Sequence, residues 1–342
     1  MAKLTIKDIA RICGVGTSTV SRAINGDAGI NKETKARILS TIEEYGFVPN
    51  SSARSLKLIE SKTIALIIKG NNNPFFEKLF GMFAEQLKTL EYSLVIQPVD
   101  IDEDEIDVAA KLLNEKRLRG IIFLGGLLDD AASRLDGLGV PYVRCTGATD
   151  RFATGQNGSS ISVDDAKESY RAVDYLCKCG HKRIAIISTK ENDNSIGTIR
   201  LNGYKKALLD NGIEPAKELI CHAIEGLNAF SADCGYELTS KLIRDGVDFT
   251  ALVCSSDMNA LGAYKAIRDA GKSIPDDYSI IGFDGLEMTK YYYPALTTVE
   301  QPSDELVRAT IDQLMRSING EEVEQTKLLR AKIVERDSVK KL

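Results

Sequence analysis

From Thr63 onward, short apolar segments alternate with amphipathic ones, and this alternation constrains the fold more than any other feature of the chain. Apolar runs of about four to eight residues suit strands buried on both faces of a sheet, and amphipathic segments of helical period suit the helices that cover it. Strands are expected at 63–68, 93–97, 120–124, 140–145, 183–188, 219–224, 250–254, 279–283, 296–299 and 327–334. Helices are expected at 74–90, 104–116, 129–138, 165–179, 197–212, 231–244, 258–270 and 303–319. The two successive series predict an α/β fold with two doubly wound parallel lobes.

The first 60 residues differ from the rest in charge as well as in pattern. They hold nine lysines and arginines against six acids, a net charge of +3, whereas the chain of 342 residues carries −5 and its remainder therefore −8. A chain of this length exceeds what one hydrophobic core usually supports. A separate basic N-terminal domain is predicted, and nucleic acid is a candidate partner for it.

Three short helices are expected in this basic segment. Residues 5–12 and 17–24 flank a turn at Gly14, and a third helix runs from Asn31 to Gly46. The sides expected to be buried are Ile6, Ile9 and Ala10, then Val20 and Ile24, then Ala36, Ile38, Leu39 and Ile42. A helix-turn-helix presents the start of its second helix to the major groove, which here would expose Thr17, Ser18, Ser21 and Arg22. A three-helix cap or dimerisation module remains the alternative.

After Pro49, residues 50–58 could form one more short helix, which would be marginal in water by itself because of its length. We expect it to need a partner to fold.

Metal, cofactor and catalytic sites are not expected. Cys177 and Cys179 precede His181, but side chains two apart on a helix point about 200° apart and no second ligand pair follows. The seven cysteines are odd in number and scattered, and there are only two histidines. No phosphate loop or nucleophile elbow is present. Charges near the N-terminus argue against export, and no apolar run reaches the roughly 18 residues of a membrane span, so a cytoplasmic protein without a membrane partner is expected.

A set of ordered motifs resembles the LacI/GalR repressor family along essentially the whole chain. The matching segments are 5–10, 14–15, 18–26, 45–50, 53–56, 73–76, 180–184, 200–204, 256–263, 282–284 and 294–299. The resemblance implies a DNA-reading headpiece, a hinge helix that orders on operator DNA, and a core like the periplasmic sugar-binding proteins. The implied domains are 1–48 for the headpiece, 49–60 for the hinge and linker, 61–161 with 291–320 for one lobe, and 162–290 with 321–342 for the other.

The expected DNA-binding residues follow from this resemblance together with the predicted helix-turn-helix. Leu56 matches the leucine that the family inserts into the minor groove, where unstacking is offset by contacts to the bent duplex. The full expected set is Thr5, Thr17, Ser18, Thr19, Ser21, Arg22, Asn25, Asn50, Ala53, Arg54, Leu56 and Lys57.

For the effector, Arg200 and Asp284 match polar pocket residues of the family, a donor and an acceptor suited to sugar hydroxyls or a carboxylate. Ser256 matches another contact position. Phe75, Phe76 and Phe230 match cleft aromatics, although each could equally be core. Gly16 and Gly285 depart from the family pattern, the first where serine usually caps the recognition helix and the second where an acid or amide follows the pocket aspartate.

The resemblance implies a homodimeric repressor of a near-palindromic double-stranded DNA operator, controlled by a small effector such as a sugar or sugar derivative. One rival is a free sugar-binding protein of a transport system, which would lack the headpiece. Another keeps the DNA function but takes a phosphocarrier protein as corepressor. Ligand binding by residues 60–342 would separate them.

Overall fold

A computed structural model describes residues 6–24, 30–45, 62–70, 73–100, 103–126, 132–147, 155, 157–191 and 195–342. The chain divides into two compact units, Met1–Glu60 and Ser61–Leu342, which are treated separately below.

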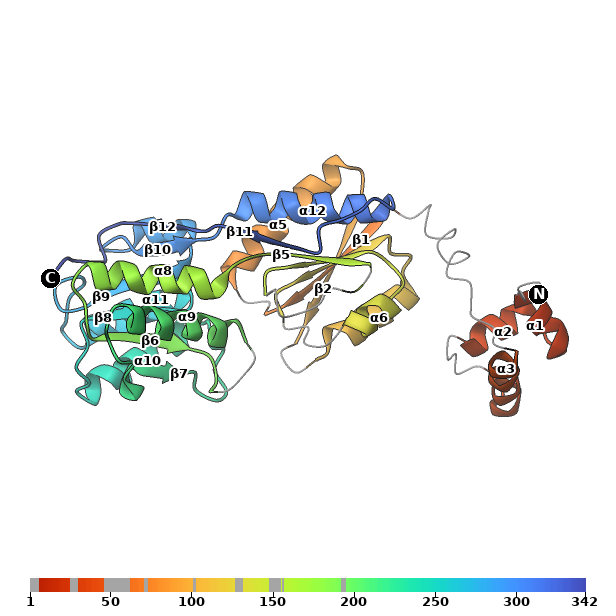
Figure 1. Cartoon of the computed structure of the whole chain (residues 1–342), viewed down its shortest axis with the longest axis horizontal. Coiled ribbons are helices and arrows are strands. Elements are labelled where there is room, and N and C mark those ends of the chain that lie inside the picture. Colours follow the sequence, from red (N-terminus) through yellow and green to blue (C-terminus); the bar gives the residue numbers. More distant parts are fainter. Residues whose placement is uncertain are drawn as a thin grey trace. The chain divides into compact units, whose positions relative to one another are not determined.

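The first unit holds α1 (Ile6–Ile12), α2 (Thr17–Ile24) and α3 (Lys32–Glu44), drawn in red in Figure 1. Among the described side chains, their shared core is formed by Ile9, Ala10, Cys13, Val20, Ala23 and Ile38, with Val15, Ile30 and Ile42 packed against it. The side chains of Ile6 and Ile24, which were also expected to be buried, lie outside the described residues. Ala36 and Leu39 were expected to be buried, and both are exposed. The expectation was wrong because α3 turns only a narrow stripe, centred on Ile38, toward α1 and α2.

The first lobe of the second unit is a six-stranded, fully parallel sheet in the order β11-β5-β4-β3-β1-β2. Its strands are β1 (Thr63–Lys69), β2 (Ser93–Val99), β3 (Gly120–Leu124), β4 (Tyr142–Cys145), β5 (Gly158–Val163) and β11 (Thr326–Leu329). The helices of this lobe are α5 (Pro74–Thr89), α6 (Glu105–Glu115), α7 (Ala132–Gly137) and α12 (Ser303–Ile318). Buried residues of α5 and α12, such as Phe83 and Leu314, form one core with strand residues such as Leu66.

The second lobe repeats the architecture in the order β12-β10-β9-β8-β6-β7, with only β12 antiparallel. Its strands are β6 (Ile184–Ser188), β7 (Ile220–His222), β8 (Ala251–Val253), β9 (Ser279–Asp284), β10 (Thr297–Glu300) and β12 (Lys332–Val334). Its helices are α8 (Asp165–Lys178), α9 (Ile196–Asp210), α10 (Ala232–Arg244) and α11 (Asp257–Asp269), with short 3₁₀ turns η1 (Lys217–Leu219) and η2 (Glu287–Tyr291).

Alternate residues of β6 belong to opposite faces of this sheet. Ile184 and Ile186 pack with α8 and α9, whereas Ala185 and Ile187 pack with α10 and α11, so helices cover both faces. This arrangement confirms the predicted α/β lobes, since a parallel strand covered on both sides reads as a continuous apolar run.

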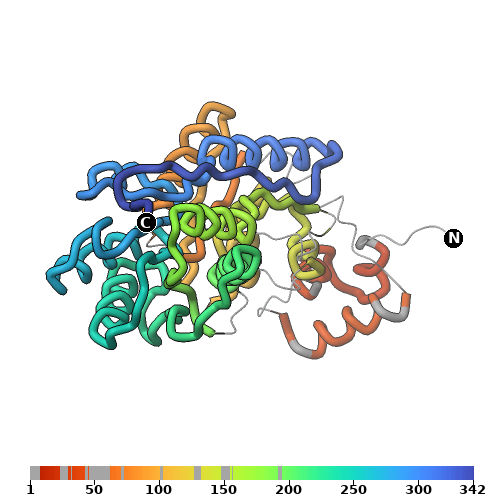
Figure 2. Tube along the Cα trace, turned by 60° about the vertical axis from the view of Figure 1, so that its left-hand side comes forward, coloured from red at the N-terminus to blue at the C-terminus, as the bar shows by residue number. Residues whose placement is uncertain are grey.

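The chain passes between the two sheets at three places, after β5, after β10 and after β11. Its last stretch, dark blue in Figure 2, returns from the first lobe to the second.

The domain limits expected from the sequence need correction. Strand β10 lies in 291–320, which was assigned to the first lobe, but it pairs with β9 of the second. The predicted strand 327–334 is two strands, of which β11 joins the first sheet and β12 the second.

Strand β5 was not anticipated at all. Its six residues are all buried, yet three of them are serines, so no apolar run marks it in the sequence.

Within the described ranges, no helix has the length and apolar character needed to cross a bilayer.

Candidate functional site

The turn between α1 and α2 has the geometry of a helix-turn-helix. Gly14 adopts a φ of +63°, and the amide of Val15 donates to the carbonyl of Ala10 at 3.0 Å, which folds the chain back on α1. The carbonyl of Gly16 then accepts from Thr19 at 2.9 Å and Val20 at 3.2 Å as α2 begins. A tight turn of this kind holds the second helix across the first.

Helix α2 presents its polar side outward. Thr17, Ser18 and Arg22 are exposed and Thr19 and Ser21 are half-buried. A row of hydroxyls followed by a guanidinium matches what a recognition helix offers to bases and phosphates. The other expected DNA contacts lie outside the described residues: Thr5, Asn25, Asn50, Ala53, Arg54, Leu56 and Lys57.

The second unit contains a cavity of about 450 Å³ between its two lobes. Strands β1, β3 and β4 of the first lobe and β6, β7 and β9 of the second all direct their carboxyl ends at it, which is where open α/β sheets bind ligands. The described polar side chains that line it are Lys69, Asn73, Thr146, Ser162, Asp165, Thr189, Lys190, Ser195, Arg200, Asn228, Asp284 and Gln301.

Arg200 is the most constrained of these side chains. Its Nε and one terminal nitrogen each lie 2.8 Å from Oδ1 of Asp165, and its Nη1 donates to the carbonyl of Ser255 at 2.5 Å. The guanidinium carbon lies 3.5 Å from the ring centroid of Phe283. Burial raises the pKa of Asp165, and the neighbouring Arg200 opposes that rise. The guanidinium therefore has a fixed position at the cavity wall.

Asp284 is the last residue of β9 and is 4% exposed. Burial raises its pKa to about 7, while Arg200 and a hydrogen bond from Gln301 lower it. The side-chain Nε2 of Gln301 donates to Oδ1 of Asp284 at 2.9 Å. The backbone amide of Gln301 donates to the backbone carbonyl of Asp284 at 3.2 Å. Asp284 is thus bound to the segment where the chain leaves β10 for the first lobe.

The three expected aromatics all line the cavity. Phe75 also belongs to the core beneath α5, whereas Phe76 is half-buried, with its ring centroid 6.0 Å from that of Phe75. Phe230 comes from the second lobe, where its amide donates to Oδ1 of Asn228 at 3.0 Å. Apolar rings therefore lie on both walls, together with the polar groups of Arg200 and Asp284.

Comparison with known proteins assigns both parts of the chain. Residues 5–50 match the model for bacterial regulatory proteins of the lacI family, and residues 173–339 match that for a periplasmic binding protein-like domain. The HTH-type transcriptional regulator MalR of Clostridium butyricum is 35% identical over 337 residues, which is 98% of this chain and 99% of MalR. The chain belongs to the LacI family.

Solved structures of the family agree with this. A complex of the transcriptional regulator CelR with cellobiose is similar with a TM-score of 0.72 and 27% identity, over 98% of this chain and 99% of CelR. A Lac repressor dimer bound to operator and an anti-inducer has the same fold, with a TM-score of 0.72 and 24% identity, over 99% of this chain and 100% of that one. As a member of the family, the chain is a DNA-binding transcriptional regulator with an effector-binding core.

One expected effector residue is not brought into the cavity lining. Ser256 is buried and does not line the cavity. Its Oγ accepts from the amide of Asn259 at 3.0 Å as the N-cap of α11, and donates to the carbonyl of Phe230 at 2.8 Å. Its hydrogen bonds are used to start a helix and to hold the loop that carries Phe230.

Several cavity residues were missed by reasoning from the sequence. Asp165 follows β5, so overlooking that strand concealed a carboxylate at a strand end. Gln301 follows β10 in the same way. Lys69 ends β1, and the general rule that polar residues after parallel strands face the ligand would have found it. Asn73 stands in a matched motif, where its Oδ1 accepts from the amide of Phe75 at 3.0 Å as the N-cap of α5.

Of the two glycines that depart from the family pattern, the structure requires only one. A Cβ on Gly16 would meet only ordinary contacts, the nearest at 3.5 Å from Oγ of Ser18, so serine would fit there. Gly285 has a φ of +74°, and a Cβ would lie 2.6 Å from Cα of Glu300. A side chain at 285 is therefore excluded by the close approach of β10.

The cysteines and the histidine at the end of α8 have structural surroundings rather than those of a metal site. Nδ1 of His181 lies 2.9 Å from Oγ1 of Thr250 and Nε2 lies 3.2 Å from the carbonyl of Lys340. Burial raises the pKa of Cys177 to about 11, which disfavours the thiolate that a metal needs. In the described part of the chain, no three histidine, cysteine or acidic side chains are grouped as metal ligands would be.

Proposed function

We propose that this regulator is a cytoplasmic repressor that binds a near-palindromic operator as a homodimer and takes a sugar or sugar derivative as its effector. The observation that carries the effector class is the cavity, in which Arg200, Asp284 and three phenylalanines lie together. Apolar rings with a few fixed polar groups suit a polyhydroxylated ring, whose faces are apolar and whose edges are hydroxyls. The CelR structure, which contains cellobiose, supports the same class.

The charges of the cavity favour an uncharged effector. Lys69 lies against Glu105 and Arg200 against Asp165, so each cation already has a carboxylate partner. Lys190 also lines the cavity, but it is exposed, where water screens its charge. Among the described cavity residues, a phosphate or carboxylate would therefore depend on the exposed Lys190 for neutralisation.

Control of DNA binding would pass through the segment between the units. In this proposal residues 1–48 read the operator, 49–60 form the hinge helix, and effector binding changes the relation of the two lobes and with it the free energy of hinge ordering. A coupling of about 1–3 kcal/mol would change operator affinity roughly 5- to 150-fold. No catalytic step is part of the proposal.

The test begins with selection of bound sequences from a pool of random DNA by the full chain. We expect a site with two similar half-sites, since a two-fold dimer reads two-fold DNA. The affinity for that site is then measured while unmodified sugars are titrated. Absence of any preferred sequence would contradict the DNA-binding part. A sequence preference that responds to a phosphocarrier protein and to no sugar would instead favour the corepressor alternative.

A further inference from the structure

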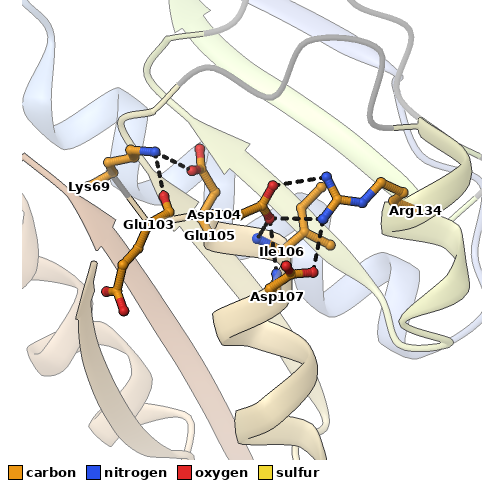
Figure 3. Close-up of polar contacts among 7 residues, drawn as sticks. All are labelled: Lys69, Glu103, Asp104, Glu105, Ile106, Asp107 and Arg134. Carbon is orange, nitrogen blue, oxygen red and sulfur yellow. Dashed lines mark hydrogen bonds and ion pairs between the residues drawn. The ribbon is translucent and has the colours of Figure 1, made fainter. Parts of the chain in front are cut away.

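Lys69 contributes a cation to the first-lobe wall of the cavity, opposite the side that carries Arg200. Its Nζ donates to Oε2 of Glu105 at 2.8 Å and to the carbonyl of Glu103 at 2.7 Å, as Figure 3 shows. An ammonium group has three N–H donors, and these bonds use two of them. One donor remains for a ligand in the cavity that Lys69 lines.

Glu105 is buried behind this wall, and one of its carboxylate oxygens is left without a hydrogen bond from the described residues. Its side chain is 6% exposed, and Oε1 is buried with no hydrogen-bond partner among the described residues, which is costly for a carboxylate. The neighbouring Gly126 makes room for it, because a Cβ there would lie 2.3 Å from that Oε1. Gly126 itself lines the cavity. The fold therefore keeps an expensive buried anion directly behind the cavity surface, where its described partner is Lys69.

The first turn of α6 fixes where Glu105 lies. Asp104 caps the helix by accepting from the amides of Ile106 at 2.9 Å and Asp107 at 3.0 Å. Both of its carboxylate oxygens also accept from Arg134 on α7, at 2.9 and 3.0 Å, and Arg134 holds Asp107 at 2.9 Å (Figure 3). Hydrogen bonds from Arg134 hold the pKa of Asp104 below its usual value. These hydrogen bonds tie the first turn of α6, which carries Glu105, to Arg134 of α7.

We propose that Lys69 is an effector contact, donating its third N–H to an oxygen of an uncharged ligand, and that Glu105 is a positioning residue that acts through Lys69. This inference rests on the proposed function and adds to it a polar contact on the first lobe. With Arg200 and Asp284 on the second lobe, the ligand would be held from both walls. Glu105 also supplies the negative charge that makes an anionic ligand unfavourable at this point.

The experiment measures sugar binding by the full chain, using titration calorimetry with unmodified mono- and disaccharides that include D-ribose, maltose and cellobiose. The wild type is compared with Lys69→Met, Glu105→Gln and the double variant. Lys62→Met is the matched control, because Lys62 precedes the same strand and its partner Glu91 is an exposed residue. Circular dichroism without sugar establishes that each variant is folded. If Lys69→Met alone fails to fold because Glu105 loses its partner, the double variant, which removes both charges, takes its place.

We expect Kd for the bound sugar to rise at least about tenfold in Lys69→Met and to stay unchanged in Lys62→Met. Glu105→Gln should raise Kd by a smaller factor and add nothing once Lys69 is absent, since it acts through that residue. Equal sugar binding by wild type and Lys69→Met would overturn the proposed contact of Lys69 and leave the proposed effector class standing. A further loss from Glu105→Gln in the Lys69→Met background would overturn the positioning role. If no sugar binds the wild type, the proposed effector class fails and this inference fails with it.

Discussion

The headpiece and the core distribute stability and function differently. In the described part of the headpiece, six buried apolar side chains hold three helices, while the candidate DNA contacts Thr17, Ser18 and Arg22 are exposed on one of them. In the core, Arg200 and Asp284 are buried, hydrogen-bonded and part of the cavity wall at once. Residues for folding and for binding are therefore separate in the headpiece and largely the same in the core.

The largest effect should come from the small core of the headpiece. Ile38 is fully buried there, and Ile38→Ala should cost about 2–5 kcal/mol of headpiece stability, a large share of what so small a domain has. We expect loss of operator binding, measured by fluorescence anisotropy, while the core keeps its melting temperature and its sugar affinity.

Leu39→Ala is the matched control, because Leu39 is the next residue and is 43% exposed. It should leave operator binding nearly unchanged. If Ile38→Ala also lowers the melting temperature of the core, the two units are not independent and the comparison fails at its first step.

A second difference should appear in the response to pH. Burial raises the pKa of Asp284 to about 7, whereas an aspartate in an unfolded chain titrates near 3.9. Between these values the folded core binds a proton that the unfolded chain does not. Its free energy of unfolding should therefore fall as pH rises from about 4 to about 7, by up to about 1.4 kcal/mol per pH unit.

Asp284→Asn should flatten this slope, measured by urea unfolding of the core at several pH values. Burial also raises the pKa of Asp165 and Asp257, so part of the slope will remain in the variant. An identical slope in wild type and Asp284→Asn would mean that Asp284 stays ionised in the folded core across this range.

How much could be predicted from the sequence also differs between the two units. Helix limits and the exposed row of α2 follow from local patterns, because capping residues and helical periodicity are read from neighbours in the chain. The core strands with apolar runs were found equally well. Strand β5 was not, since its burial comes from its neighbours β4 and β11, the latter more than 160 residues away.

The same limit applies to the cavity. Arg200 and Asp284 were found through family motifs, but Lys69 and its partner Glu105 lie 36 residues apart and carry no shared motif. The sequence does not decide the role of Ser256, because a serine before a helix fits either a ligand contact or an N-cap, and its hydrogen-bond partners in the fold are those of an N-cap. Pairings between distant segments are what the sequence does not display.

Arg22 tests the other side of the comparison, an exposed residue that is expected to bind DNA. Because its side chain is exposed on α2, Arg22→Ala should change headpiece stability by no more than about 0.5 kcal/mol. Because arginine can pair with guanine through two hydrogen bonds, preference at one base pair in each half-site should relax by about 1–3 kcal/mol. Competition binding against single-base operator variants measures this. Arg37 on α3 is also exposed, and Arg37→Ala should leave the base preference intact. An unchanged base preference in Arg22→Ala would mean that Arg22 does not contact the bases.

Ser256 should give the smallest effect and tests the reverse case, a core residue with a part in folding and none in binding. Ser256→Ala removes the N-cap of α11 and the hydrogen bond to the carbonyl of Phe230, which should cost about 1–2 kcal/mol of core stability. Sugar affinity should change only slightly, through the loop that carries Phe230. Urea unfolding and titration calorimetry on the same protein separate the two quantities. A large loss of affinity at unchanged stability would return Ser256 to the ligand contacts, and would show that folding and binding residues overlap in the core even more than the cavity lining indicates.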